Sequence, residues 1–333
     1  MKVQIYMGGF KIVEKSGIGR AILHQTACLK QAGIEVTNAW FEPAKVIHIN
    51  TVFPDSLLAA LFAKIQGKSV VYYGHSTVED FRNSFKGANT LAPLFRCWIK
   101  FCYGLGDIIL TPTIYSKKLL ESYGLKKTIY PISNGIDTVF FKPDRSKREG
   151  FRKKYEIKGQ KPVIISVGHY IARKGIMEFA ELARSMPEAE FLWFGYTNLK
   201  LIPQEIKAVV ENPPKNLRFP GYISAEEMRD AYCSADVFAF MTHEETEGIV
   251  VLEALACGIP VVVRDIPVYD NWLRDDVEVC KARSTLEFKE KVQSILRGEK
   301  SQLTANGLEI ANKRSMQVIG LYLHEIYKKE KFI

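Results

Sequence analysis

The stretch over residues 243–263, HEETEGIVVLEALACGIPVVV, constrains the fold of this chain more than any other. A polar loop leads through Gly248 into a run that is almost wholly apolar. Its length and flanks predict a buried helix over 248–256, a Gly-Ile-Pro turn and a short buried strand over 261–263.

One carboxylate, Glu253, lies inside this apolar helix, where ionisation is costly unless hydrogen-bond donors meet it. Glu245 precedes it by eight residues, so the two carboxylates are roughly 10–12 Å apart if most of the gap is helical. Between them, the free N–H groups of the first helical turn form an anion site that needs no metal ion. A plainer alternative is that Glu253 pairs with a core arginine and that the loop acids face solvent. The combined pattern favours a ligand site.

The segment ETEGIVVLEALACGIPVVV resembles the Glu-x7-Glu motif of family-4 glycosyltransferases, which are retaining enzymes of the GT-B fold that use nucleotide sugars. The resemblance implies that Glu253 binds the ribose hydroxyls and that Glu245 contacts the donor sugar or stabilises a cation. Many members carry an aromatic residue where Glu247 stands, and Glu-Thr-Glu-Gly is closer to the branch that adds sugars to diacylglycerol. Backbone amides facing sugar or phosphate oxygens would come from residues 247–250, including Gly248, Ile249 and Val250.

Around this stretch, short apolar strands alternate with helical patterns in two successive units, which predicts an α/β fold with parallel sheets. A basic stretch over 142–154 indicates the linker between the units. The resemblance implies the GT-B architecture, in which two Rossmann-like, doubly wound domains face a cleft. We expect an acceptor-side and membrane-side domain over 1–143 and a donor-side domain over 144–310. The resemblance implies that a helix over 311–333 crosses back to the first domain. The sequence alone also allows a helix that binds a partner.

Two glycines follow the first predicted strand and open a helix, Gly17 and Gly19. This spacing lets the backbone approach a phosphate closely, although a tight strand-to-helix turn needs the same residues. The third glycine of the dinucleotide fingerprint and its acidic residue are missing, which disfavours a nicotinamide oxidoreductase. Two further candidates rest on the resemblance: His75, after the strand over 69–73, would contact the donor sugar, and Asn134 would lie at the cleft. The alternative for His75 is a hydrogen-bonded structural role.

Arg173 and Lys174 lie between a predicted strand over 163–167 and a helix over 176–185, a place suited to a diphosphate. Family members usually have an arginine where His169 stands here and a lysine where Lys174 stands. We expect Arg173 to supply the missing guanidinium. No Asp-x-Asp metal motif is present, so we expect no metal ion and no cofactor, with charge on the leaving diphosphate met by these two cations and helix-terminal amides.

Charge is distributed unevenly along the 333 residues. Residues 1–150 hold 20 Lys and Arg against 11 Asp and Glu, whereas the remainder holds 26 of each. The segment over 79–107 interleaves cations with aromatic rings, which favours contact with an anionic membrane surface over an ordinary packing helix. No nucleic-acid motif accompanies the charge. No apolar run is long enough to span a membrane, and six scattered cysteines indicate a reduced, cytoplasmic protein without zinc. We therefore expect a peripheral protein on the inner face of the cell membrane.

The segments YMGGF, KSGIGRAI and GHSTVEDF extend the resemblance to the glycolipid-forming branch. The resemblance implies a retaining hexosyltransferase that moves galactose or glucose from a UDP-sugar to alpha-monoglucosyl-diacylglycerol, forming a dihexosyl lipid. One alternative is an enzyme of the same fold that acts on a polysaccharide or undecaprenyl-linked acceptor. Another is a non-catalytic basic protein that binds membranes.

Overall fold

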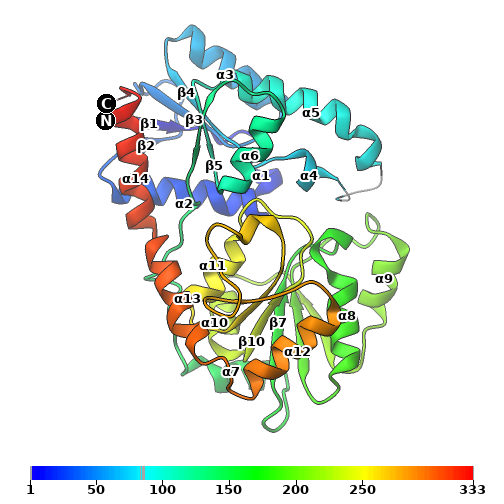
Figure 1. Cartoon of the computed structure of the whole chain (residues 1–333). Helices are drawn as coiled ribbons and strands as arrows, with labels where there is room; N and C mark the ends of the chain where they lie inside the picture. The colour runs from blue at the N-terminus through cyan, green and yellow to red at the C-terminus, as the bar shows by residue number, and fades with distance from the viewer. Residues whose placement is uncertain (1, 83, 85–86, 333) are drawn as a thin grey trace.

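The computed structural model describes residues 2–82, 84 and 87–332, and Figure 1 shows them as two α/β domains stacked one on the other. Each domain contains a sheet of six strands whose neighbours all run parallel. In the first domain the strands are β1 Lys2–Ile5, β2 Glu35–Thr37, β3 Val46–Ile49, β4 Ser69–Tyr73, β5 Ile108–Thr111 and β6 Thr128–Pro131. Its helices are α1 Phe10–Val13, α2 Gly17–Gln31, α3 Pro54–Ile65, α4 Val78–Phe81, α5 Ala88–Gly104 and α6 Ile114–Ser122.

The second domain repeats this architecture. Its strands are β7 Val163–Val167, β8 Glu190–Phe194, β9 Leu217–Gly221, β10 Val237–Phe240, β11 Val261–Arg264 and β12 Cys280–Ala282. Its helices are α7 Lys147–Lys154, α8 Ile176–Ser185, α9 Gln204–Glu211, α10 Ala225–Ser234, α11 Ile249–Ala256, α12 Thr285–Leu296 and α13 Gln302–Lys313, and 3₁₀ turns cover Ala172–Lys174 and Pro267–Tyr269. The predicted α/β class with two doubly wound parallel sheets is confirmed.

Both sheets are buried on both faces, because successive strand residues enter different apolar clusters. In β7, Val163 and Ile165 belong to one cluster and Ile164 to another. In β4, Val71 packs on one side and Val70 on the other. Side chains alternate across a strand, so each sheet has an apolar core above and below it. This explains why the strands are almost uniformly apolar rather than alternating.

The strand orders place a switch point in each sheet. The first sheet runs β2-β1-β3-β4-β5-β6, and the second runs β12-β11-β10-β7-β8-β9. In the second sheet, the connections from β7 and from β10 lead away in opposite directions. Ligands of doubly wound sheets bind in the crevice that this divergence opens at the carboxyl ends of the strands.

The end of the chain returns to the first domain. Helix α14, Met316–Lys329, packs against α2 (Figure 1) and its Leu323 joins the first domain's core. The helix expected over 311–333 is in fact two helices, because the Ser315 side chain accepts a hydrogen bond from the Val318 amide and starts a new one. The division of the chain at residues 143 and 310 stays a prediction.

Candidate functional site

A pocket lies between the two domains at the switch point of the second sheet. Its floor is formed by the loops after β7 and β10 and the start of α11, and the turn before α2 of the first domain closes it. Seven residues singled out from the sequence line this pocket together: Gly17, Lys174, Glu245, Gly248, Ile249, Val250 and Glu253. The other four, Gly19, His75, Asn134 and Arg173, are not among its lining residues.

Glu253 is the buried acid of the pocket. Its side chain is 1% exposed, and burial raises the pKa of its carboxyl. The Tyr232 hydroxyl donates to Oε2 at 3.1 Å, whereas Oε1 accepts no hydrogen bond from the described residues. The nearest cation to Oε1 is Nη1 of Arg20, 3.4 Å away, and Arg20 comes from the first domain across the pocket. Glu253 therefore pairs with a pocket arginine rather than with one from the core, and its buried Oε1 has no hydrogen-bond donor among the described residues.

Lys174 and Glu245 form an ion pair inside the pocket. The ammonium of Lys174 contacts Oε1 of Glu245, which also accepts a hydrogen bond from Thr242 Oγ1 at 3.2 Å. The two side chains lie 71 positions apart in the sequence, and they meet because β7 and β10 are neighbouring strands. This arrangement places the Lys174 ammonium in the same pocket as the start of α11, and its contact with a diphosphate stays a prediction.

Gly248 shapes the start of α11. Its φ of 85° is left-handed, a conformation that glycine adopts without steric cost. The turn brings the first residues of α11, Ile249 and Val250, to the pocket lining. Such first-turn amides have no partner within the helix and can donate to an anion.

Arg173 points to the first domain instead of the pocket. Its Nη1 lies 2.8 Å from the Asp80 carboxylate at the start of α4 and donates to the backbone carbonyl of Glu244 at 2.7 Å. This side chain thus joins the two domains beside the site. The guanidinium that does line the pocket is that of Arg20, which sequence reasoning missed. The available signal was its place directly after Gly17-Ile-Gly19, in the first turn of a helix.

His75 is buried behind the cleft. Its Nε2 lies 3.2 Å from Asn50 Oδ1 and 3.2 Å from Gln25 Nε2, and its ring stacks on Tyr73. Burial lowers the pKa of His75 to about 3, so the ring is neutral at physiological pH. These contacts match the hydrogen-bonded structural alternative, and a contact with a donor sugar stays a prediction.

Asn134 explains the unusual Glu247. The Asn134 backbone amide and side-chain amide both donate to Oε2 of Glu247, at 3.1 and 2.7 Å. Glu247 is therefore turned toward the first domain, where it holds the loop after β6. Gly19 also has a packing role, because a Cβ there would lie 2.3 Å from the carbonyl oxygen of Val13, whereas a Cβ on Gly17 would meet nothing within 4 Å.

A second acidic group lies at the edge of the site. The Tyr115 hydroxyl of the first domain donates to both carboxylate oxygens of Glu244, at 2.9 and 3.1 Å. Burial, together with the nearby charges of Asp80, Glu79 and Glu245, raises the pKa of Glu244 to about 7. This carboxyl therefore titrates near neutrality, at a contact between the domains.

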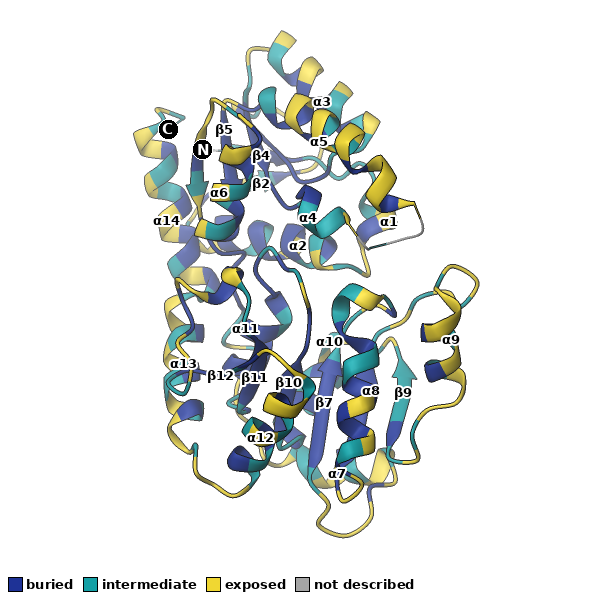
Figure 2. Ribbon diagram, turned by 45° about the vertical axis from the view of Figure 1, so that its right-hand side comes forward, coloured by how far each residue is buried: buried dark blue, intermediate teal, exposed yellow. Residues whose placement is uncertain are grey.

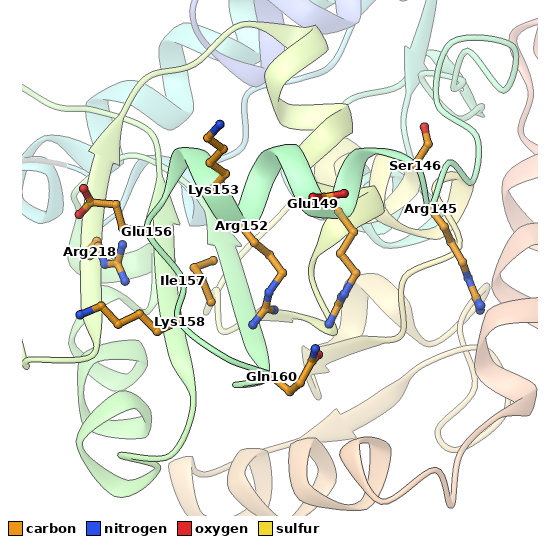
Figure 3. Close-up of a pocket in the computed structure, with 11 residues that line it drawn as sticks. Arg145, Ser146, Glu149, Arg152, Lys153, Glu156, Ile157, Lys158, Gln160 and Arg218 are labelled. Atoms are coloured by element: carbon orange, nitrogen blue, oxygen red, sulfur yellow. The ribbon is translucent and has the colours of Figure 1, made fainter.

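A wider hollow of about 1140 Å³ lies along α7, at the end of the second domain far from the cleft (Figure 3). Several of its arginines hold backbone carbonyls: Arg148 donates to Ser234, and Arg152 donates to Gly159 and Lys161. No predicted site residue lines it. Within the described residues, no group of three or more His, Cys, Asp or Glu side chains is arranged to hold a metal ion.

Two doubly wound domains with a pocket between them, at the switch point of the second sheet, form the GT-B fold. The chain superposes on the Anabaena HepE protein, solved in complex with UDP-glucose, with a TM-score of 0.78, 15% identity and 99% and 100% of the two chains covered. It also superposes on sucrose-phosphate synthase from Thermosynechococcus elongatus, with a TM-score of 0.81, 16% identity and 99% and 98% covered. At these identities the likeness shows the fold.

The sequence places the chain within this class. Residues 147–307 match the model of the glycosyl transferases group 1, and residues 38–140 match that of glycosyltransferase family 4. The chain is 38% identical over 331 residues to the processive diacylglycerol alpha-glucosyltransferase of Acholeplasma laidlawii, covering 99% of this chain and 98% of that protein. It is 26% identical over 277 residues to the alpha-galactosylglucosyldiacylglycerol synthase of Streptococcus pneumoniae, covering 81% and 72%.

The chain belongs to the group 1, family 4 glycosyltransferases, and the resemblance inferred from its motifs is confirmed. It is a glycosyltransferase, so the alternative of a non-catalytic membrane-binding protein is wrong.

Proposed function

We propose that this glycosyltransferase moves a hexose from a UDP-sugar to alpha-monoglucosyl-diacylglycerol, with retention at the anomeric carbon, and forms a dihexosyl glycolipid. The observation that carries the proposal is the 38% identity, over nearly the whole chain, to a diacylglycerol glucosyltransferase. The name of that relative favours glucose as the transferred sugar. Galactose is the second candidate, because the chain is also similar to a galactosylglucosyl-diacylglycerol synthase.

The pocket supports this reaction chemically. Glu253 takes the ribose hydroxyls on Oε1, the oxygen that accepts no hydrogen bond from the described residues, and Lys174 with the first amides of α11 offsets charge on the leaving diphosphate. The bond from the anomeric carbon to the diphosphate oxygen breaks, and the acceptor hydroxyl oxygen bonds to that carbon. The acceptor's proton passes to the departing phosphate, so no protein base is required and none is assigned. No metal ion or cofactor enters this proposal.

The lipid acceptor is supported by an exposed apolar surface on the first domain, which we define as the outer faces of α3 and α5 (Figure 2). On α3 the exposed apolar side chains recur with helical spacing, and on α5 they border a groove of about 520 Å³ lined almost entirely by apolar side chains. Soluble surfaces rarely carry large contiguous apolar patches without a partner. The side chains that define this surface are Leu58, Leu61, Phe62 and Ile65 of α3, and Leu91, Leu94 and Phe101 of α5.

We propose that this surface rests on an anionic membrane. The exposed Arg82, Arg96 and Lys100 lie in or beside α5 and suit anionic headgroups, while the apolar side chains suit the layer beneath. No helix of the described residues is long and apolar enough to cross a membrane. We place the contact at the inner face of the cell membrane, in line with the cytoplasmic character expected from the cysteines.

Sugar transfer to liposomes tests the proposal. Liposomes with anionic lipid, with or without monoglucosyl-diacylglycerol, are supplied separately with UDP-glucose and UDP-galactose, and products are resolved by chromatography. We expect a dihexosyl lipid only when the glucolipid is present. Glu253→Gln should greatly reduce that product.

Other products decide between the remaining candidates. Transfer to plain diacylglycerol would move the enzyme to the first glycosylation step. If the UDP-sugars stay intact with diacylglycerol and with monoglucosyl-diacylglycerol, the proposed lipid acceptor is wrong. That result would favour a polysaccharide or undecaprenyl-linked acceptor.

A further inference from the structure

Arg20 is held in the pocket by a weak contact. It lies in the first turn of α2, is 30% exposed, and reaches from the first domain to Glu253 of the second. The 3.4 Å between Nη1 and Oε1 is beyond the usual length of a charge-assisted hydrogen bond, and Oε1 accepts no hydrogen bond from the described residues. The pairing is therefore electrostatic and easily exchanged.

Lys174 and Arg173 are more firmly engaged than Arg20, whereas the exposed Lys15 of the pocket lining lies over the Tyr222 ring. Lys174 contacts the carboxylate of Glu245 directly, and Arg173 is bound to Asp80 and to a backbone carbonyl. Arg20 is the one arginine among the described residues that line the pocket. A planar guanidinium can donate two parallel hydrogen bonds to phosphate oxygens, which an ammonium cannot do.

Glu253 cannot serve two partners equally well. A buried carboxylate needs a compensating cation or hydrogen-bond donors, and Arg20 supplies the cation when no ligand is bound. Ribose hydroxyls would supply donors to the same oxygen. When the hydroxyls occupy Oε1, the guanidinium of Arg20 is no longer needed to offset the charge of Glu253. It can then bind the donor's diphosphate, which lies in the same pocket next to Lys174 and the start of α11.

We propose that Arg20 acts as a placeholder on Glu253 and, when the donor's ribose binds there, moves to the donor's diphosphate and binds it. The inference rests on the proposed UDP-sugar donor. It assigns to the first domain a direct contact with the donor, and it makes binding of the nucleoside and of the diphosphate interdependent. Arg20 thus supplies the guanidinium for the diphosphate, the role that we expected for Arg173 from the sequence.

Binding of uridine and of UDP to the full chain, measured by calorimetry, tests this exchange. In Arg20→Ala we expect UDP to bind about ten- to a hundredfold more weakly, the range of a lost charge-assisted contact. Uridine should bind at least as tightly as in the wild type, because Glu253 no longer has to release a partner. Arg20→Lys keeps a point charge and should recover part of the UDP affinity.

The matched control is Lys30→Ala, which removes an exposed cation from the last turn of the same helix. It should leave both affinities unchanged. Equal weakening of uridine and UDP in Arg20→Ala, or no change in either, would overturn the placeholder role. If the wild-type chain binds uridine and UDP equally, the diphosphate contact is wrong whatever the variants do. A wild-type chain that binds neither would refute the UDP-sugar donor itself, and this inference with it.

Discussion

At the scale of single residues, the site consists of charged groups whose partners come from different loops or different domains. Lys174 is paired with Glu245 across the switch point, and Glu253 faces Arg20 across the cleft. Most of these side chains are largely buried, so the loss of one partner leaves the other without compensation. Substitutions here should therefore affect activity much more than their small volume suggests.

Lys174→Ala should lower the turnover of sugar transfer by roughly a hundredfold or more, because the positive charge beside the leaving diphosphate is lost. The measurement is kcat in the liposome assay, with thermal unfolding to confirm that the variant is folded. Lys161→Ala is the control, since Lys161 pairs with Glu190 and lines no part of the pocket. Wild-type turnover in Lys174→Ala would contradict the phosphate role.

Glu244 should make stability depend on pH. Burial raises the pKa of Glu244 from 4.5 to about 7, so between these values the folded chain holds a proton that the unfolded chain has lost. The free energy of unfolding contributed by this group therefore falls as pH rises through that window and is flat above it.

Glu244→Gln removes this loss of stability at higher pH, since glutamine does not ionise. Its side-chain carbonyl can still accept the hydrogen bond from Tyr115. The difference in Tm, variant minus wild type, should be more positive at pH 8 than at pH 5. Glu121→Gln, an exposed position on α6, is the control. A Tm difference that is the same at both pH values would show that Glu244 does not titrate in this window.

At the scale of helices and strands, two placements matter. The pairing of β7 with β10 brings together two loops that are far apart in the sequence. The outward faces of α3 and α5 are apolar, although a helix on the surface of a soluble domain normally turns polar residues outward. The first placement builds the pocket, and the second supports a membrane contact on the same domain that is expected to bind the acceptor.

Leu58→Gln combined with Ile65→Gln should weaken binding to anionic vesicles by roughly tenfold or more, because each buried aliphatic side chain contributes about 1.5–3 kcal/mol. Both side chains are mostly exposed, so Tm should change little. Co-sedimentation with vesicles measures the effect. Leu201→Gln with Leu286→Gln, equally exposed but on the second domain, is the matched control. Equal loss in the two double variants would argue against a specific membrane face.

At the scale of the whole molecule, the chain crosses between the domains twice at adjacent places. Ile136, after the first domain's last strand, pairs with Ser315, just before α14. Helix α14 then packs on α2, where Gly320 comes so close that a Cβ would lie 2.3 Å from the Cys28 carbonyl oxygen. The hydroxyl of Tyr327 further along α14 contacts His48 of β3. The last helix is thus part of the first domain's core.

Gly320→Ala should destabilise the protein by about 1–3 kcal/mol, the usual cost of overpacking, because α14 must move away from α2. Urea unfolding measures the change. Gly150→Ala is the control, because a Cβ at Gly150, inside α7, would meet nothing within 4 Å, and alanine is the better helix former there. Unchanged stability in Gly320→Ala would mean that the two helices can separate without cost.

Much of the fold was encoded locally. The short apolar strands and the helix predicted over 248–256, which the structure shows over Ile249–Ala256, followed from periodicity and turn residues, which depend on neighbouring positions. The pocket's floor was predictable for the same reason, since Gly248, Ile249, Val250 and Glu253 lie in one continuous segment. Lys174 and Gly17 could be placed because strand ends in such sheets converge on a shared crevice.

Only the tertiary structure decided which long side chains reach across the cleft. Arg173 lies in the 3₁₀ turn Ala172–Lys174 and Arg20 in the first turn of α2, yet the first is bound to Asp80 and the second lines the pocket. Likewise, Glu247 holds Asn134 rather than facing the donor side. The physical reason is that an arginine or glutamate side chain can reach several partners, and its choice depends on how two separately folded domains are placed. The sequence by itself determined the α/β class and the pocket floor, and the packing of one domain on the other determined which charges line the pocket.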